Sequence, residues 1–282
     1  MRRFKFFPDK EIAVEKRNID TGERIIPILI LKRKGHSGDA PGVLWIHGGG
    51  YATGMKEMVY MGRGESLVKN YGAVVISVGY TLSPFKPYPA GFNDCYAALK
   101  YLKEHVYELG IRENQIMVGG ESAGGGLCAA LCMKARDTGD VNIAYQMPLY
   151  PMIDNLDTNS SRDNHAKVWN TRRNHMAWSM YLRGIGKENV PPYAAPARQT
   201  DYTRLPPAYT FVGTAEPFYD ETLTFIDNLK KAGVEATVDV YEGMYHAFDM
   251  MEPDSEVSKE AISRFEKHFE YAIENYSAEG KS

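Results

Sequence analysis

The sequence predicts an α/β protein with a mostly parallel sheet and helices on both faces of that sheet. Short apolar segments rich in β-branched residues alternate with segments of helical periodicity, and this alternation is typical of parallel sheets. Several central segments are apolar throughout, as strands buried on both faces should be. Hydrophobic residues make up 44% of the 282 residues, which is enough for a sizeable core. We expect a single domain over residues 1–282.

Eight strands follow from this pattern. They are predicted at residues 11–18, 25–32, 43–46, 73–78, 115–118, 144–149, 208–212 and 236–241. No helical segment separates the first two strands, so we expect them to form an antiparallel edge of the sheet.

Helices are predicted in the segments between these strands. Apolar residues recur at helical spacing over 92–109, and Gly110 follows as a stop signal. A second helix is predicted over 220–232, and a third is expected to begin near residues 253–255.

Residues 154–204 interrupt the alternation of strands and helices. The segment contains Trp169, Trp178 and Tyr181 but no clean strand pattern. Long excursions in a compact domain are usually functional lids or disordered segments, and the aromatic residues favour an ordered one. We therefore expect a small cap, inserted before the last two strands.

The composition argues against several kinds of partner. The formal net charge is −3, whereas nucleic-acid binding favours a basic surface. No run of 18 apolar residues is present, and the basic N-terminus lacks a following apolar stretch, so we expect neither a membrane span nor a secretory signal. Cys95, Cys128 and Cys132 are too few for a disulfide framework, which favours the cytoplasm. A homodimer is left open.

A serine stands among five glycines directly after a predicted strand. Gly120-Glu121-Ser122-Ala123-Gly124 matches the pattern G-x-S-x-G, in which a sharp strand-to-helix turn exposes a nucleophilic serine. Small neighbours are needed because the chain reverses its direction at once. The strand before the motif and the small residues after it favour this turn over a simple glycine-rich loop.

A second glycine-rich loop, His47–Gly50 (HGGG), follows the third predicted strand. Backbone N–H groups in such a loop can stabilise the negative oxygen of a tetrahedral intermediate, because glycine lets the backbone approach closely. The N–H group of Ala123 would be the partner donor. A dinucleotide-binding fingerprint would need a glycine where Thr53 stands, so the spacing excludes it.

Among seven histidines, His246 is the best candidate for a general base. It follows the last predicted strand by five residues, and loops after parallel strands gather at the carboxyl edge of a sheet. An acid is expected between the serine and the histidine in sequence. Glu216 is favoured, because Pro217 disfavours helical geometry at that residue. Asp220, expected inside the next helix, remains the alternative acid.

These motifs together resemble those of the hormone-sensitive-lipase-like carboxylesterases, the bacterial family IV of the α/β-hydrolase fold. The likeness covers about residues 40–250 and rests on four stretches in order. They are His47–Gly50; Tyr80–Pro84 with Tyr88-Pro89-Ala90 and Asp94; Gly120–Gly125; and Glu216-Pro217 with His246-Ala247-Phe248.

The resemblance implies an α/β-hydrolase with an eight-stranded, mostly parallel sheet and a cap. The residues that it assigns to the site are Ser122 as nucleophile, His246 as base, Glu216 as acid, and Gly49, Gly50 and Ala123 as oxyanion donors. Glu121 and Glu216 stand where this family usually has aspartate. The extra methylene of Glu216 requires either a loop that sits farther back or a carboxylate that folds over.

The sequence thus predicts a serine hydrolase that cleaves short-chain carboxylic esters through an acyl-enzyme, without metal or organic cofactor. The aromatic residues of 154–204 would suit stacking on the sugar of an acetyl ester, or they anchor the cap, which we favour. Two alternatives remain: a peptidase or formamidase on the same triad, and a non-catalytic binding protein on the same scaffold. The presence of both nucleophile and base argues against the second.

Overall fold

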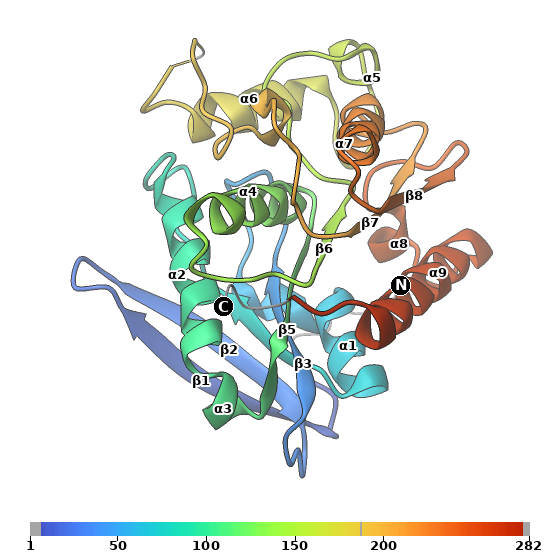
Figure 1. The fold of residues 1–282 in the computed structure, drawn as a ribbon. Helices are drawn as coiled ribbons and strands as arrows, with labels where there is room; N and C mark the ends of the chain where they lie inside the picture. Colours follow the sequence, from blue (N-terminus) through green and yellow to red (C-terminus); the bar gives the residue numbers. More distant parts are fainter. Residues whose placement is uncertain (1–6, 187, 279–282) are drawn as a thin grey trace.

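The computed structural model describes residues 7–186 and 188–278, and all eight predicted strands are confirmed within them (Figure 1). The strands are β1 (Ile12–Asp20), β2 (Ile25–Arg33), β3 (Ala40–Ile46), β4 (Val74–Val78), β5 (Ile111–Glu121), β6 (Tyr145–Leu149), β7 (Ala208–Gly213) and β8 (Ala236–Tyr241). They form one sheet in the order β1-β2-β4-β3-β5-β6-β7-β8. The predicted antiparallel pairing of β1 with β2 is confirmed; β2 also runs antiparallel to β4, and the remaining pairs are parallel.

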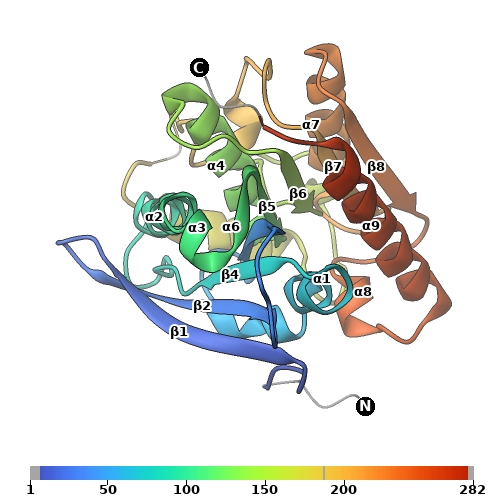
Figure 2. The ribbon, with the colours of Figure 1, turned by 60° about the horizontal axis from the view of Figure 1, so that its bottom comes forward.

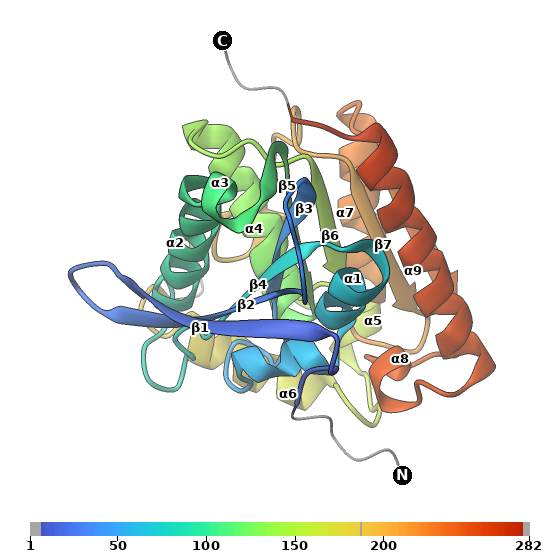
Figure 3. The same cartoon turned by 90° about the horizontal axis from the view of Figure 1, so that it is seen from below.

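Helices cover both faces of this sheet, as predicted. Side chains of α2 (Ala90–Glu104), α4 (Ala123–Thr138) and α7 (Tyr219–Lys231) pack on one face. Those of α1 (Arg63–Tyr71) and α9 (Glu256–Asn275) pack on the other. In Figure 3, β3 and β5 lie between α2 and α9. Figure 2 shows the β1–β2 hairpin and the β8–α9 unit at opposite edges of the sheet.

The apolar character of the central strands reflects this double coverage. In β3, Leu44 contributes to the core on the α2 side and Trp45 to the core on the α9 side. Val118 and Met117 of β5 divide in the same way. All four side chains are buried, which explains why apolar residues follow one another without alternation here.

Two boundaries differ from the prediction. Strand β5 begins four residues before the predicted 115, with polar side chains at 112–114. The register against β3 shifts between Ala40 and Gly42, so the strand starts in an irregular part of the ladder. The helix predicted over 92–109 is interrupted at His105, after which α3 (Val106–Leu109) begins.

Residues 154–186 and 188–204 contain α5 (Asn159–Arg162), α6 (Thr171–Tyr181) and the 3₁₀ turn η2 (Pro196–Arg198), and no strand. In Figure 1, α5 and α6 lie above the carboxyl ends of the central strands. Trp178 and Tyr181 are buried, and the ring of Tyr181 stacks on Tyr51 with 4.0 Å between centroids. These two aromatic residues therefore anchor the segment to the core.

Two further short elements each precede a longer helix. They are the 3₁₀ turn η1 (Lys56–Tyr60), before α1, and α8 (Phe248–Met251), before α9. In the described part of the chain, no helix combines the length and apolar character needed to cross a membrane.

The substitution Phe265→Ala tests how much the packing of α9 on the sheet contributes to stability. The Phe265 side chain is fully buried and meets Trp45 edge-on, with 5.9 Å between ring centroids. We expect Phe265→Ala to lower the free energy of unfolding by about 3–5 kcal/mol, because the lost ring leaves a cavity. Tyr271→Ala, on the exposed side of the same helix, should cost much less. Urea unfolding measures both, and equal losses would contradict this packing.

Candidate active site

Ser122 occupies the sharp turn between β5 and α4. Its backbone has φ +58° and ψ −120°, a conformation that L-residues rarely adopt and that is common at functional sites. The neighbouring glycines are required by contact: a Cβ on Gly124 would lie 2.0 Å from the carbonyl oxygen of Ile46, and one on Gly120 would lie 2.5 Å from it. The turn therefore depends on close packing against the end of β3.

The structure brings Ser122, His246 and Glu216 together from three separate segments. His246 Nε2 lies 2.9 Å from Ser122 Oγ, and His246 Nδ1 lies 2.5 Å from Glu216 Oε2. All three residues are buried, with Glu216 fully so. This arrangement allows the serine hydroxyl to donate a proton to Nε2, while Nδ1–H donates to the carboxylate.

Glu216 meets His246 by folding its carboxylate back over its own turn. Oε1 accepts a hydrogen bond from the N–H of Gly213 at 3.1 Å, which leaves Oε2 for the imidazole. The one carboxylate therefore contacts both its own turn and the imidazole.

Asp220, the alternative acid, faces a different partner. Its Oδ2 accepts a hydrogen bond from the N–H of Ser160 at 2.8 Å, and its own N–H donates to Ser160 Oγ. Asp220 therefore connects the start of α7 to α5, while Glu216 faces the imidazole.

The loop His47–Gly50 packs directly against the serine turn. A Cβ on Gly48 would lie 3.2 Å from Ser122 Cβ, and one on Gly49 would lie 2.2 Å from the carbonyl oxygen of Thr53. Gly49 and Gly50 both have positive φ. In the described residues their N–H groups donate to no protein acceptor, and the N–H of Ala123 belongs to the first turn of α4, where helical partners are lacking.

The side chain of His47 contacts and stabilises this loop. Its Nδ1 lies 2.8 Å from the carbonyl oxygen of Gly48, and its ring stacks on Tyr80 with 4.3 Å between centroids. Burial lowers the pKa of His47 to about 4, so the ring is neutral at pH 7 and can donate from Nδ1. Its role in the described structure is to shape the glycine loop.

A buried polar cluster beside the serine turn was missed at the sequence level. It comprises Trp45, Arg63, Glu121, Tyr150 and Asp249. Burial raises the pKa of Glu121 to about 7. No local motif marks this cluster, because its members come from segments far apart in the chain; the glutamate before Ser122 is the one local sign.

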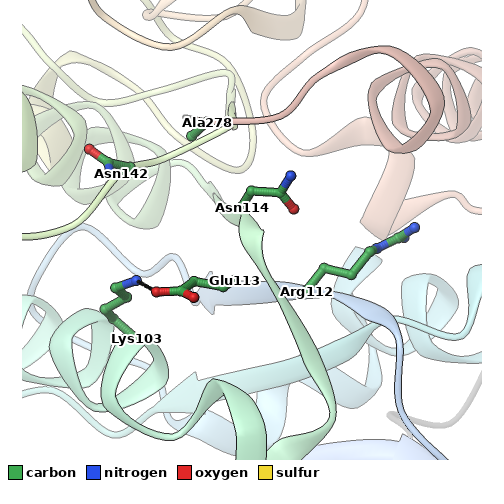
Figure 4. Close-up of a pocket in the computed structure, with 6 residues that line it drawn as sticks. All are labelled: Lys103, Arg112, Glu113, Asn114, Asn142 and Ala278. Carbon is green, nitrogen blue, oxygen red and sulfur yellow. Dashed lines mark hydrogen bonds and ion pairs between the residues drawn. The ribbon is translucent and has the colours of Figure 1, made fainter. Parts of the chain in front are cut away.

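The site contains no evident place for a metal ion: among the residues that the structure describes, no group of three or more His, Cys, Asp or Glu side chains is arranged to hold one. A cavity of about 480 Å³ lies at the other end of β5. Figure 4 shows its lining residues, Lys103, Arg112, Glu113, Asn114, Asn142 and Ala278. Arg112 precedes Ser122 by ten strand residues, roughly 30 Å, so this cavity is separate from the site.

The pKa of Glu121 gives a prediction for stability. The folded chain binds the Glu121 proton more tightly than the unfolded chain, so the free energy of unfolding should fall as pH rises from about 4.5 to about 7. Glu121→Gln removes this dependence. We expect the variant, relative to wild type, to gain about 2–3 kcal/mol between pH 5 and pH 8. Urea unfolding at both pH values checks this, with exposed Glu256→Gln as control; an unchanged pH dependence would contradict it.

The chain is similar to known hydrolases and esterases. A family model described as alpha/beta hydrolase fold matches residues 43–250. Carboxylesterase NlhH of Mycobacterium tuberculosis is 30% identical over 258 residues, which cover 88% of this chain and 80% of that protein. Esterase LipI of the same organism is 31% identical over 212 residues, covering 74% and 66% respectively.

Among solved structures, a bacterial heroin esterase superposes with a TM-score of 0.84 at 32% identity, covering 94% of this chain and 83% of that one. The residues matched by the family model include the glycine loop, the serine turn and both Glu216 and His246. The chain therefore belongs to the α/β-hydrolase fold family, within its hormone-sensitive-lipase-like carboxylesterases.

Proposed function

We propose that this carboxylesterase cleaves short-chain esters through an acyl-enzyme formed on Ser122. The observation that carries the proposal is the hydrogen-bonded line from Ser122 through His246 to Glu216, at 2.9 and 2.5 Å. His246 takes the serine proton as Oγ attacks the ester carbonyl carbon. Glu216 keeps the imidazole in the required tautomer and stabilises its cation.

The negative oxygen of the tetrahedral intermediate needs donors that are already in place. We assign them to the N–H groups of Gly49, Gly50 and Ala123, which border Ser122. The intermediate then collapses, the C–O bond to the alcohol breaks, and His246 returns the proton to the leaving oxygen. A water molecule, deprotonated by His246, attacks the acyl-enzyme and releases the acid with Ser122 restored.

The acyl group is proposed to be short because Trp169 limits the space beside these donors. A Cβ on Gly50 would lie 2.3 Å from Trp169 Cη2, so the indole edge rests on the glycine loop. The same ring lies 6.2 Å from the ring of His246 and 6.3 Å from that of Phe218, centroid to centroid. Trp169 comes from residues 154–204, which we therefore take to be the cap of a single domain.

Acetyl esters of sugars remain a candidate substrate class. Of Trp169, Trp178 and Tyr181, the last two are buried, and Trp169 is the one that could stack on a sugar ring. Matched ester and amide substrates separate the proposal from peptide or formamide hydrolysis, in which His246 would have to protonate a poorer leaving group. A cytoplasmic location is also proposed, supported by three buried free cysteines.

Three alanine variants test the proposed triad. We expect Ser122→Ala to abolish ester hydrolysis, because no acyl-enzyme can form. Glu216→Ala should lower kcat on the order of 10³-fold or more, whereas Asp220→Ala should change it much less, since Asp220 binds Ser160. Initial rates on an acetyl ester, with folding checked by circular dichroism, measure all three. A larger fall for Asp220→Ala would move the acid to that residue.

A substitution at Trp169 tests the acyl limit. We expect Trp169→Ala to raise kcat/KM for a hexanoyl ester relative to an acetyl ester on the order of tenfold, because the removed indole opens space beside Gly50. The control is Met176→Ala, on an exposed position of α6. An acyl series from acetyl to octanoyl, run beside acetylated sugars, provides the ratios. An unchanged preference in Trp169→Ala would show that another feature sets the acyl length.

A further inference from the structure

Arg63 and Asp249 form a buried ion pair that joins two distant segments of the chain. Arg63 Nη2 contacts Asp249 Oδ2, and the two side chains are 9% and 1% exposed. Arg63 is the first residue of α1, and Asp249 lies in α8, three residues after His246. Removing one partner of such a pair leaves an uncompensated buried charge at high cost, so the pair fixes the α8 segment against the start of α1.

The start of α1 also contacts the serine turn. Trp45 Nε1 donates to both carboxylate oxygens of Glu121 at 3.0 Å, and the backbone N–H of Arg63 lies 3.5 Å from Oε1. Glu121 directly precedes Ser122. One residue, Arg63, therefore faces the serine turn with its backbone and the histidine segment with its side chain.

Tyr150 connects this cluster to the imidazole of His246. Its ring meets that of His246 edge-on, with 5.1 Å between centroids. Its hydroxyl is buried, donates to no protein acceptor among the described residues, and lies within the electrostatic influence of Asp249, Glu121 and Arg63. Through Tyr150, the cluster therefore contacts the imidazole whose Nε2 must reach the serine.

The link between Asp249 and His246 is short and strained. Ala247, which precedes α8, has φ +58° and ψ +30°, a left-handed conformation that L-residues adopt at a cost. Phe248 is buried against Phe211, with 5.9 Å between ring centroids. A shift of Asp249 would therefore be passed to the imidazole through a turn that has little freedom.

We propose that Arg63 and Asp249 are positioning residues that hold His246 Nε2 within reach of Ser122 Oγ. Neither side chain contacts the reacting atoms; the pair acts through the His246 segment on one side and the serine turn on the other. The inference rests on the function proposed above. A misplacement of about 1 Å at reacting groups can cost on the order of 10²-fold in rate, so a pair that sets this distance should affect kcat.

The direct test is the double variant Arg63→Met/Asp249→Leu. Removing both charges takes the ion pair out as a unit, and such replacements are often neutral for stability. Glu121 keeps its hydrogen bonds from Trp45. We expect a folded protein whose kcat on an acetyl ester is about 10- to 100-fold lower, with KM changed by about twofold or less. A merely structural pair would leave kcat unchanged in a folded variant, and that result would overturn the proposal.

A matched control removes another Arg–Asp pair. Arg264 of α9 and Asp239 of β8 pair near the surface, where the two side chains are 48% and 11% exposed. Arg264→Met/Asp239→Asn should keep kcat within about twofold of wild type, since surface pairs contribute little. An equal fall of kcat in this control would overturn the assignment to Arg63 and Asp249.

Asp249→Glu keeps the test decisive if the double variant does not fold. This substitution preserves the charge and the ion pair but lengthens the side chain by one methylene. It should therefore change the position of the His246 segment more than the stability of the fold. We expect kcat to fall about tenfold with KM unchanged; a wild-type kcat would overturn the proposal. Wild type and Ser122→Ala are measured in the same assay. If wild type hydrolyses the ester and Ser122→Ala does not, the proposed function stands, and the variants report on the Arg63–Asp249 pair alone.

Discussion

The buried contact between His246 and Glu216 is the interaction on which the site depends. A carboxylate without solvent exposure needs partners, and Glu216 has two: the imidazole Nδ1–H and the N–H of Gly213. With Nδ1–H held by the carboxylate, the lone pair on Nε2 faces the hydroxyl of Ser122. A neutral imidazole in this orientation can accept a proton, and the carboxylate compensates the charge that results.

The sheet makes this contact possible. Parallel strands β5, β7 and β8 end at the same edge, so the serine turn, the Glu216 turn and the His246 loop meet although they are far apart in sequence. The glycine loop after β3 joins them at the same edge (Figure 1). Core packing on both faces fixes the positions of the strand ends. The strained backbone at Ser122 and Ala247 directs side chains toward the centre of the candidate active site.

Much of this architecture could be predicted from the sequence because its signals are local. Strands buried on both faces are continuously apolar, as at 43–46 and 73–78, and glycine-rich turns leave a clear pattern around Ser122. The chain order of serine, acid and histidine then limited the candidates. The choice between Glu216 and Asp220 depended on the directions of their side chains. The sequence does not give these directions for two carboxylates that lie four residues apart.

Other features could not be predicted, since they arise from long-range packing. Arg63 and Asp249 are 186 positions apart, and nothing near either residue indicates the other. The aromatic residues of the cap show the same limit: composition grouped Trp169 with Trp178, yet the structure buries Trp178 in the core and places Trp169 on the glycine loop. Glu121 shows the same limit, because the groups that meet its carboxylate, Trp45 Nε1 and the backbone N–H of Arg63, come from distant segments.

Covalent labelling shows whether Ser122 and His246 act together, because the reaction needs both the nucleophile and the base. The protein is incubated with an organophosphonate, and the adduct is located by mass spectrometry of the intact chain and of its peptides. We expect one adduct, on Ser122, that forms at least a hundredfold more slowly in His246→Ala. Labelling at another residue, or undiminished labelling of Ser122 without the imidazole, would contradict it.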